Sequence, residues 1–595
     1  MEPLNTFPRP DFARSRWQSL DGTWQFAFSD EVSASAAELA IGRGYDRIIQ
    51  VPFCYQSTQS GIGDRSYHEC VWYARTLFLT TDQCAGSVLL NFGAVDYEAR
   101  LYINGQFAGA HTGGFAQFGF DIAPYVCPGE NTIALCVHDD RSVDRPRGKQ
   151  SWLEQPDRCW YTPTTGIWRS VWVEFTGKQH ITELRLLPDI DRRCVMTDLR
   201  FSDPVTGTLT VRIRWQERLC KELTLRVEVA SYLHECFTLA PEDAVDDLHL
   251  WSPQSPSLYD ISFTLSSENA VLDEVHSYFG MRKIEANGDT IRLNYQPLYQ
   301  RLILDQGYWS RSLMTPPNEE ALLRDLMLIR DMGFNGLRMH QKNEDPRLLY
   351  HADRLGLLVW LEMPSAYACT PRSVRSVLSE WGEIVRQNWN HPSIIAYVPF
   401  NESWGVRDIR AEAMQRSLAN CAYHLTRALD PTRLISTNDG WEFPENTDFY
   451  GFHSYFPDTE TFRAQFSDWS RRAAEGMVNR PLALDGEPLP RRPVLLTEFG
   501  GIAMQSAEGA VSTQFDSSGD WGYNAAATDP AELTARLRTQ VDAVLDTDYL
   551  CGYCYTQLTD VEQEINGLLT PERVPKLPLP VLREIFSRAP LRYRR

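Results

Sequence analysis

The sequence predicts a multidomain protein of the β plus α/β class: an N-terminal β jelly roll, an immunoglobulin-like β-sandwich and a C-terminal (β/α)₈ TIM barrel. Up to about residue 286, short runs of alternating apolar and polar residues are separated by Gly, Pro, Asp and Asn, which is typical of antiparallel strands. After that point, short apolar runs alternate with helical periodicity, which is typical of parallel strands joined by helices. The length of 595 residues agrees with three domains of ordinary size.

Residues 1–177 are expected to form the jelly roll. The dipeptide Asn104-Gly105 predicts a tight hairpin turn, because both residues tolerate a positive φ. Strands at this close spacing are typical of a sandwich or jelly roll. The clearest of these strands span residues 87–92, 98–105, 131–139 and 171–175.

Residues 178–286 are expected to form the second β-domain. The runs 208–215 and 223–230 alternate with period two, as half-buried strands do. The size of this region fits a seven-strand sandwich of the immunoglobulin type.

Residues 287–595 are expected to form the barrel, because eight apolar strands can be counted and most are followed by a helical segment. An open doubly wound sheet is the alternative, but no Gly-rich nucleotide fingerprint follows any of these strands. The eight strands are expected at 299–304, 334–340, 357–362, 393–402, 433–439, 449–455, 492–500 and 549–560.

Barrel enzymes place catalytic groups where the strands end, so the polar residues at these positions are candidates for a site. Glu402 ends the fourth strand and Glu498 the seventh, and across a barrel mouth such a pair can lie about 5–5.5 Å apart, the arrangement used for glycoside cleavage with retention. Taken singly, Glu402 could instead be a helix N-terminal carboxylate and Glu498 a partner in a salt bridge. The other strand ends carry Asp305, His340, Glu362, Asn401, Asp439, His453, Tyr455 and Tyr555.

Aromatic residues and an amide supply candidates for sugar binding. Asn401, directly before Glu402, could bond the sugar hydroxyl next to the anomeric carbon. Trp404 and Trp521 could stack on sugar faces, although packing within the barrel is the alternative for each of them.

Composition and charge exclude several other classes. A formal net charge of −20 disfavours a nucleic-acid binder, and 12% aromatic residues disfavour a disordered chain. No apolar run is long enough to span a membrane and no secretory leader is apparent, so a cytoplasmic location is expected. The 13 Cys have no regular spacing, which argues against a disulfide framework.

Several motifs together resemble glycoside hydrolase family 2, the family of β-galactosidase-like and β-glucuronidase-like retaining exo-glycosidases. The segment from His391 to Trp404 is similar to its acid/base signature, and Val494–Gly500 is similar to its nucleophile strand. The resemblance covers essentially the whole chain and includes the family's sugar-binding jelly roll. Further matching segments are 20–26, 166–169, 333–338, 353–360 and 559–569.

The resemblance implies a retaining mechanism through a covalent glycosyl-enzyme intermediate. No cofactor is expected, and no residue is expected to bind a metal ion. It implies that Glu402 is the acid/base residue, that Glu498 is the nucleophile and that Asn401 holds a sugar hydroxyl. Tyr455 falls where the family often has a Tyr in contact with the nucleophile. The remaining residues expected to bind substrate are His340, Asp305, Trp404, Trp521 and Tyr555.

The sugar is less well defined by the sequence than the reaction is. Residues 304–309 and 339–345 differ from the metal-binding sequences of the large galactosidases. Leu568 stands where glucuronidases carry a Lys for the sugar carboxylate, which leaves Lys342 as a possible cation. A terminal β-galactoside is the first expectation, and a β-galactofuranoside, an α-L-arabinoside and a β-glucuronide are the alternatives.

Two further functions stay open at this stage: transfer of the glycosyl group to an alcohol, and non-catalytic carbohydrate binding. The expected partner is a small carbohydrate or glycoside, with neither nucleic acid nor membrane, and a homo-oligomer is possible.

Overall fold

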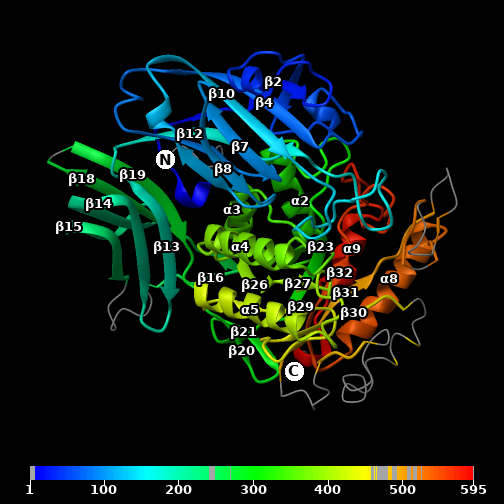
Figure 1. The fold of residues 1–595 in the computed structure, drawn as a ribbon. Coiled ribbons are helices and arrows are strands. Elements are labelled where there is room, and N and C mark those ends of the chain that lie inside the picture. The colour runs from blue at the N-terminus through cyan, green and yellow to red at the C-terminus, as the bar shows by residue number, and fades with distance from the viewer. Residues whose placement is uncertain are drawn as a thin grey trace.

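The computed structural model describes residues 7–593 except 240–247, 269, 457–460, 462–463, 465–479, 485–491, 506–510, 513–518 and 524. Figure 1 shows three parts in chain order: a blue-to-cyan β-domain at the top, a green β-domain at the left, and a barrel in green to red below and to the right. The domain bounds 1–177, 178–286 and 287–595 stay a prediction. The 13 cysteines are free. Among the described residues, no helix is both long enough and apolar enough to cross a membrane.

The N-terminal domain is a sandwich of two antiparallel sheets around an apolar core that includes Trp24, Phe92 and Val173. One sheet has the order β1(Trp17–Ser19), β12(Val171–Thr176), β5(Ser87–Phe92) and β9(Phe118–Asp121). The other has the order β3(Arg47–Val51), β2(Gly22–Phe28), β4(Cys70–Leu79), β10(Gly129–His138), β7(Glu98–Ile103) and β8(Gln106–Thr112). A two-strand pair joins β6(Val95–Asp96) to β11(Gly166–Ile167), and α1(Ala36–Ala40) lies outside the sheets. The expected turn at Asn104-Gly105 connects β7 to β8.

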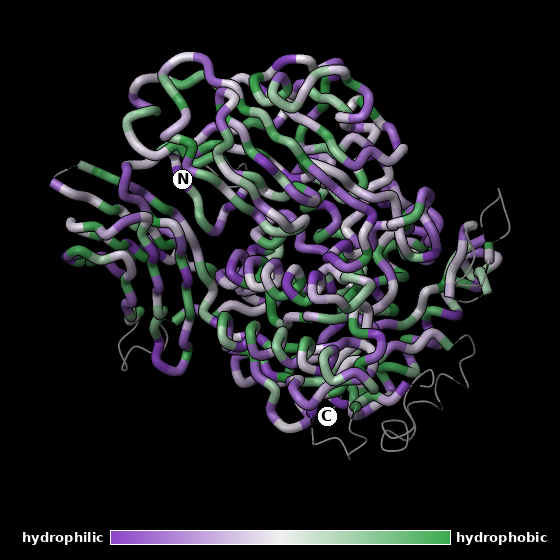
Figure 2. Tube along the Cα trace, viewed as in Figure 1, coloured by the Kyte–Doolittle hydropathy of each residue, from purple (hydrophilic) through white to green (hydrophobic). Residues whose placement is uncertain are grey.

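The middle domain contains five paired strands in its described part, not the seven expected. The sheet has the order β13(Ile181–Asp189), β14(Cys194–Trp215), β18(Tyr259–Ser267) and β19(Ala270–Phe279), with β15(Arg218–Thr238) also paired to β14. Register shifts interrupt β14 between Arg200 and Gly207, so that its first half pairs with β13 and its second half with β18. One bent sheet thereby encloses a core that two sheets would otherwise share. Hydrophobic and hydrophilic positions alternate along these strands (Figure 2).

The barrel is built from eight parallel strand positions, as the sequence predicts. The sheet has the order β28(Leu434–Ile435), β26(Ile394–Val398), β25(Leu358–Glu362), β24(Gly336–Met339), β23(Gln300–Asp305), β32(Leu550–Thr556), β31(Val494–Gly500) and β30(Tyr450–Ser454). The fourth and fifth strands continue as β27(Phe400–Asn401) and β29(Asn438–Asp439), which pair with each other. A parallel bridge from Gly440 to Phe452 then joins the fifth strand to the sixth, where the sheet would otherwise be open.

Helices follow the barrel strands, and the starts of four of them agree with capping chemistry. Asn318, Asp345, Thr370 and Asp529 each accept a backbone N–H in the first turn of the helix that follows, which satisfies a donor that the helix leaves unpaired. The helices are α2(Glu319–Asp331), α3(Pro346–Leu355), α4(Pro371–Asn388), α5(Ala413–Leu429), α8(Pro530–Leu545) and α9(Leu579–Phe586).

The sandwich domains contact the barrel through buried polar groups. Arg169 of the N-terminal domain donates to the carbonyl oxygens of Asn343 and Glu344. Arg282, near the end of the middle domain, donates to the carbonyl oxygens of Pro392 and Ile394. Small strands before the barrel complete the fold: β16(Trp251–Ser252), β17(Ser255–Pro256), β20(Ile284–Asn287), β21(Thr290–Leu293) and β22(Gln296–Pro297).

Candidate active site

A fully buried arginine forms the floor of the barrel mouth. Arg338, on β24, donates from Nη1 to Oε1 of Glu498 at 2.9 Å and from Nη2 to Oε1 of Glu362 at 2.8 Å. Nη2 also lies 3.2 Å from Oδ2 of Asp439 and donates to Oδ1 of Asn401 at 2.7 Å. Burial favours the uncharged forms of Glu362 and Asp439, but the Arg338 charge lowers the pKa of both carboxyls below their ordinary values.

Both carboxylate oxygens of Glu498 accept hydrogen bonds. Oε1 accepts from Arg338, while Oε2 accepts from the Tyr455 hydroxyl at 2.6 Å. That hydroxyl also lies 2.9 Å from Oγ1 of Thr556, and the Tyr455 ring stacks on Tyr523 at 3.6 Å between centroids. A carboxylate that is held in one orientation by hydrogen bonds to both oxygens is suited to attack an electrophilic carbon.

Glu402 faces Glu498 from the end of the fourth strand. Its backbone has a φ of +53°, and that of Ser403 is +58°, a conformation that costs energy for residues with a side chain. The surrounding barrel maintains it, because Glu402 N–H donates to the carbonyl oxygen of Asp439 at 2.8 Å and Ser403 N–H donates to Oδ1 of Asn438. The carboxylate is directed at the mouth and its side chain is 22% exposed.

Carboxylate oxygens of Glu402 and Glu498 lie within 4.8 Å of each other and of a ring nitrogen of His453. Retaining glycosidases hold their carboxyl groups about 5–5.5 Å apart, whereas inverting enzymes need roughly 6.5–9.5 Å for an intervening water. The spacing here agrees with the retaining geometry.

His453, at the end of β30, lies between these carboxylates. Its Nδ1 is 2.7 Å from Oε1 of Glu402, and its Nε2 is 3.3 Å from Oδ2 of Asp439. Burial would lower the pKa of His453, but Glu498, Asp439 and Glu402 raise it to about 10. Burial would raise the pKa of Glu402, but the hydrogen bond and charge of His453 lower it below its ordinary value.

A metal ion does not fit this triad. Both ring nitrogens of His453 face carboxylate oxygens, which accept hydrogen bonds, so both nitrogens carry protons and neither offers a lone pair.

Three further predicted binding residues reach the same mouth. Asn401 is 2% exposed, and its Oδ1 accepts a hydrogen bond from Arg338, which can only donate. The Nδ2 group of Asn401 is therefore left to donate to a ligand. His340 places Nδ1 2.8 Å from Oε2 of Glu362, which orients the ring beside the floor. Trp404 donates from Nε1 to Oε2 of Glu402 at 3.3 Å.

The structure corrects three predictions about the substrate pocket. Tyr555 is fully buried and packs edge-on against Phe499 and Phe586, on the helix side of β32, because side chains alternate along a strand. Its neighbour Thr556 faces the mouth instead. Asp305 likewise points away from the barrel interior, toward Asp325 of α2, and burial followed by that charge raises its pKa to about 6.

Trp521 is the third correction, since it packs beneath the site and does not present a ring face to a sugar. It is fully buried, and its Nε1 donates to the carbonyl oxygen of Arg158 at 2.9 Å. Its ring packs edge-on against Tyr523 at 5.0 Å, so it supports the ring on which Tyr455 stacks.

The N-terminal domain contributes a cation to the site. Lys149 is 8% exposed and has Cys159, Glu564 and Tyr367 around its amine, and no ion pair of this amine with a carboxylate is found among the described residues. Its charge acts on Glu402. By contrast, Lys342 is fully engaged with Glu344 and with two carbonyl oxygens, so it is not the substrate cation that the sequence left open.

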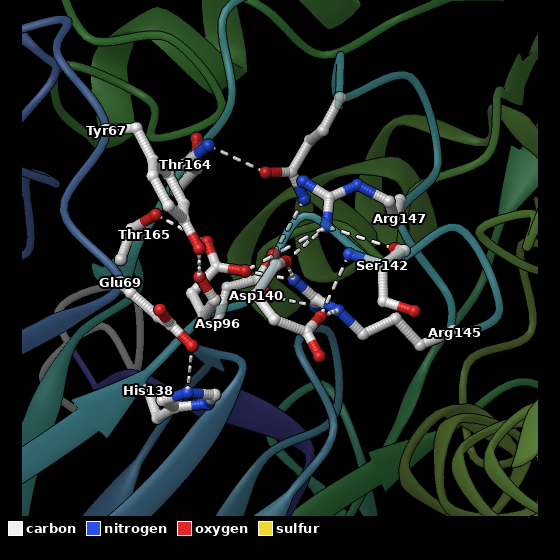
Figure 3. Close-up of polar contacts among 12 residues, drawn as sticks. Tyr67, Glu69, Asp96, His138, Asp140, Ser142, Arg145, Arg147, Thr164 and Thr165 are labelled. Carbon is white, nitrogen blue, oxygen red and sulfur yellow. Dashed lines mark hydrogen bonds and ion pairs between the residues drawn. The ribbon is translucent and has the colours of Figure 1, made fainter. Parts of the chain in front are cut away.

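A buried ionic network anchors the loop that carries Lys149. Arg145 is fully buried and donates to Asp96 at 3.0 Å, to Asp140 at 3.1 Å and to Asp139. In Figure 3 the charged ends of Asp96, Asp140 and Arg145 converge, with Arg147 beside them. A fully buried ion cluster is stable only when each charged group in it has a partner, because an unpaired buried charge is costly.

Both neighbours of Lys149 are fixed in place. Gln150 donates to Asp96 at 2.7 Å and accepts from the Thr164 N–H at 2.6 Å. On the other side, Gly148 has a φ of +59°, and a Cβ at this position would lie 2.4 Å from the carbonyl oxygen of Gln341. The loop therefore approaches the barrel backbone closely, and only a glycine fits there.

Sequence reasoning named some of these groups without assigning them a role. The sequence shows that Glu362, Asp439 and His453 stand at strand ends. Which charged groups each of them contacts is visible only in the folded structure. Arg338 precedes the second strand end by two residues, and a charged residue in an apolar strand was the signal. Lys149 had no signal, because it belongs to another domain.

Models of known protein families match this chain. Three family models match in sequence order: "Glycosyl hydrolases family 2, sugar binding domain" at residues 17–176, "Glycosyl hydrolases family 2" at 180–282, and "Glycosyl hydrolases family 2, TIM barrel domain" at 317–589. The chain belongs to glycosyl hydrolases family 2. The predicted family, fold class and enzyme class are thereby confirmed.

Curated relatives of this family 2 chain are distant. A putative β-glucuronidase of Formosa agariphila is 25% identical over 62% of this chain and 45% of its own length. A β-galactosidase of Thermoanaerobacter pseudethanolicus is 25% identical over 59% and 47%, so the chain matches less than half the length of these two. A β-glucuronidase of Streptococcus agalactiae is 22% identical over 81% of this chain and 82% of its own.

Solved structures agree with the fold. The β-glucuronidase from Ruminococcus gnavus in complex with N1-substituted uronic isofagomine aligns with a TM-score of 0.75 at 18% identity, over 96% of this chain and 98% of that one. The β-glucuronidase 2 of Bacteroides uniformis, covalently bound to a cyclophellitol-6-carboxylate aziridine, aligns with a TM-score of 0.72 at 22% identity, over 94% and 68%.

Proposed function

We propose that this chain is a retaining exo-β-glycosidase, with Glu498 as nucleophile and Glu402 as acid/base residue. The observation that carries the proposal is the pair of carboxylates within 4.8 Å across the barrel mouth, in unlike surroundings. Glu498 receives hydrogen bonds on both oxygens, one of them from a fixed cation, whereas Glu402 is partly exposed at the mouth. Different surroundings give two carboxylates different roles.

The reaction then proceeds in two displacements. Glu498 attacks the anomeric carbon while Glu402 delivers a proton to the leaving oxygen, which forms the glycosyl ester. Water next attacks the same carbon, Glu402 takes its proton, and Glu498 leaves as a carboxylate. Asn401 would donate from Nδ2 to the sugar hydroxyl beside the reacting carbon, and Arg338 keeps both Asn401 and Glu498 in place.

A terminal β-galactoside is the first candidate substrate. Leu568 is 2% exposed and belongs to the apolar core, so the position at which glucuronidases carry a Lys offers no cation here. Relatives named β-galactosidase are among the matches.

A β-glucuronide is the second candidate, and one residue favours it. Lys149 brings a buried ammonium group near Glu402 from the N-terminal domain, where it could meet a sugar carboxylate. Relatives named β-glucuronidase also match.

A panel of nitrophenyl glycosides tests the proposal and ranks the sugars: β-galactopyranoside, β-galactofuranoside, β-glucuronide, β-mannoside and α-L-arabinosides. The product's anomeric configuration, followed by NMR, should match the substrate's. Glu498→Gln should abolish turnover, whereas Glu445→Gln, an exposed carboxylate away from the mouth, should leave turnover unchanged. Full activity of Glu498→Gln, or inversion at the anomeric carbon, would contradict the mechanism.

A further inference from the structure

His453 is surrounded by three carboxylates that come from three different barrel strands. Its Nδ1 lies 2.7 Å from Glu402 and 3.5 Å from Glu498, and its Nε2 lies 3.3 Å from Asp439. The side chain is 1% exposed. A register shift between Phe452 and His453 sets this position, because it places His453 opposite Glu498 in the ladder.

These contacts determine the charge of the ring. Each carboxylate oxygen accepts a hydrogen bond, so the ring donates from both nitrogens and is an imidazolium. Its pKa of about 10 agrees with that state. The Trp441 ring lies edge-on to the His453 ring at 5.6 Å, and Gly440 packs against it. Of the cations at the mouth, Arg338 contacts Glu498 and Asp439, and the charge of Lys149 acts on Glu402.

This arrangement leaves open where the proton of the catalytic acid comes from. The acid of the first displacement must carry a proton, yet His453 keeps Glu402 ionised. The nearest proton available to Glu402 is the one on Nδ1 of His453, at 2.7 Å.

We propose that His453 stores the proton that Glu402 delivers to the leaving group, so that the acid of this site is the Glu402–His453 pair. The inference rests on the proposed function, since it concerns the same site. His453 acts through Glu402 and touches no substrate atom, which makes it a positioning residue for the proton.

The first displacement balances as follows in atoms and charge. The bond from Glu498 to the anomeric carbon forms and the bond from that carbon to the leaving oxygen breaks. The leaving oxygen takes a proton from Glu402, and Nδ1 of His453 supplies one to Oε1 of Glu402. Glu498 loses its negative charge as the ester forms and His453 loses its positive charge, so the buried site keeps the same net charge.

The second displacement reverses these changes. Water attacks the anomeric carbon, the ester bond to Glu498 breaks, and the proton of the water passes to Glu402 and on to His453. Because the charge of Glu498 favours the protonated form of His453, the return of that charge recharges the pair for the next turnover.

The experiment compares the pH dependence of kcat/KM for the wild type and for His453→Gln. The proton of the pair should be lost near pH 10 in the wild type, which places the alkaline limb there. In the variant Glu402 must hold the proton alone, so the limb should move to lower pH by at least about one unit. His111→Gln is the matched control, since His111 also lies beside a carboxylate, Glu383 at 3.3 Å, but outside the site. An unshifted limb in His453→Gln would overturn the inference.

Leaving groups provide an independent readout. The variant should lose roughly tenfold or more in kcat/KM on a glycoside with a poor leaving group and far less on a dinitrophenyl glycoside, which needs no acid. In a Glu402→Ala background, His453→Gln should cause no further selective loss. An equal loss on every leaving group would indicate a structural role and contradict the proposal.

If His453→Gln does not fold, the wild-type protein still decides the question. Ring ¹⁵N signals of labelled histidine should show one buried imidazolium at pH 8 that becomes neutral when a 2-fluoro glycoside traps the ester on Glu498. A ring that is neutral in the free protein would refute the inference. Failure of the proposed function has a different signature, because no ester and no glycoside turnover would then be found at all.

Discussion

Arg338 determines how the acidic residues of the mouth share their charge. It bonds Glu498, Glu362 and Asn401 directly and lies beside Asp439, so one guanidinium stabilises three buried carboxylates and orients one amide. A guanidinium has five donors in a fixed plane, and a lysine could not make these bonds at once. The roles proposed for Glu498 and Asn401 therefore depend on a residue that would not itself react.

At this scale, Glu402→Ala should separate substrates by their leaving groups. Poor leaving groups need protonation, so kcat/KM should fall by roughly 10²–10⁴ for an alkyl glycoside. For a dinitrophenyl glycoside the loss in kcat/KM should be small, because that phenolate leaves unaided. Steady-state kinetics on both substrates checks this, and equal losses would remove Glu402 from the acid role.

Lys149→Met should change the choice of sugar more than the chemistry. The variant keeps the length of the side chain and removes its charge, so kcat/KM on a β-glucuronide should fall by roughly tenfold relative to a β-galactoside. Lys283→Met, at a surface ion pair of the middle domain with Asp191, is the control. An unchanged ratio of the two activities would exclude Lys149 from the glycone pocket.

At the scale of the element, the loop between β10 and β11 connects the N-terminal domain to the chemistry. It leaves the sandwich at His138, is fixed by the Arg145 network and places Lys149 against the barrel. A rigid loop of this kind preorganises a side chain that a mobile loop would have to order on binding.

Gln150→Ala should loosen this element without removing a charge. Asp96 and the Thr164 N–H would each lose a buried partner, at a cost of about 1–3 kcal/mol each, and KM should rise several-fold as Lys149 loses its fixed position. Gln155→Ala, an exposed position on the same loop, should behave as the wild type. Thermal unfolding and steady-state kinetics measure the two effects, and an unchanged KM would show that the loop does not position substrate.

At the scale of the whole molecule, the seam between the N-terminal domain and the barrel contains a carboxyl group with an unusual charge state. Oε1 of Glu380, on α4, accepts from the Phe115 N–H at 2.6 Å, and no hydrogen-bond partner of its Oε2 is found in the described part of the chain. Burial raises the pKa of Glu380 to about 8. The folded protein therefore binds this proton more tightly than the unfolded chain does, and that contribution to stability is lost as the pH rises from about 4.5 to about 8.

Glu380→Gln should remove this dependence. An amide has the same shape and no charge, so the variant should be more stable than the wild type at pH 9, by up to a few kcal/mol, and similar at pH 4. Melting temperatures across that range test it. If the melting temperatures of the wild type and of Glu380→Gln differed by the same amount at pH 4 and at pH 9, the raised pKa assigned to Glu380 would be contradicted.

How much the sequence can predict differs between the strands and the site. The eight barrel strands and the capped helices follow from local signals: apolar runs of strand length, and Asn, Asp or Thr directly before a helix. The five-strand sheet of the middle domain could not be predicted from such signals. The interrupted strand β14 has two paired halves, and in the sequence each half looks like a separate strand.

The sequence by itself determined the order of the three domains and the two glutamates at matching strand ends, because both depend on local period and position. Only the tertiary structure decided which side of a strand each residue faces and which groups meet from different domains. Tyr555 and Thr556 exchange places with respect to the mouth through the alternation of one strand, and that depends on register. His453 and Lys149 gain their charged surroundings from segments far apart in the chain, and electrostatic interactions depend on distance in space and on burial.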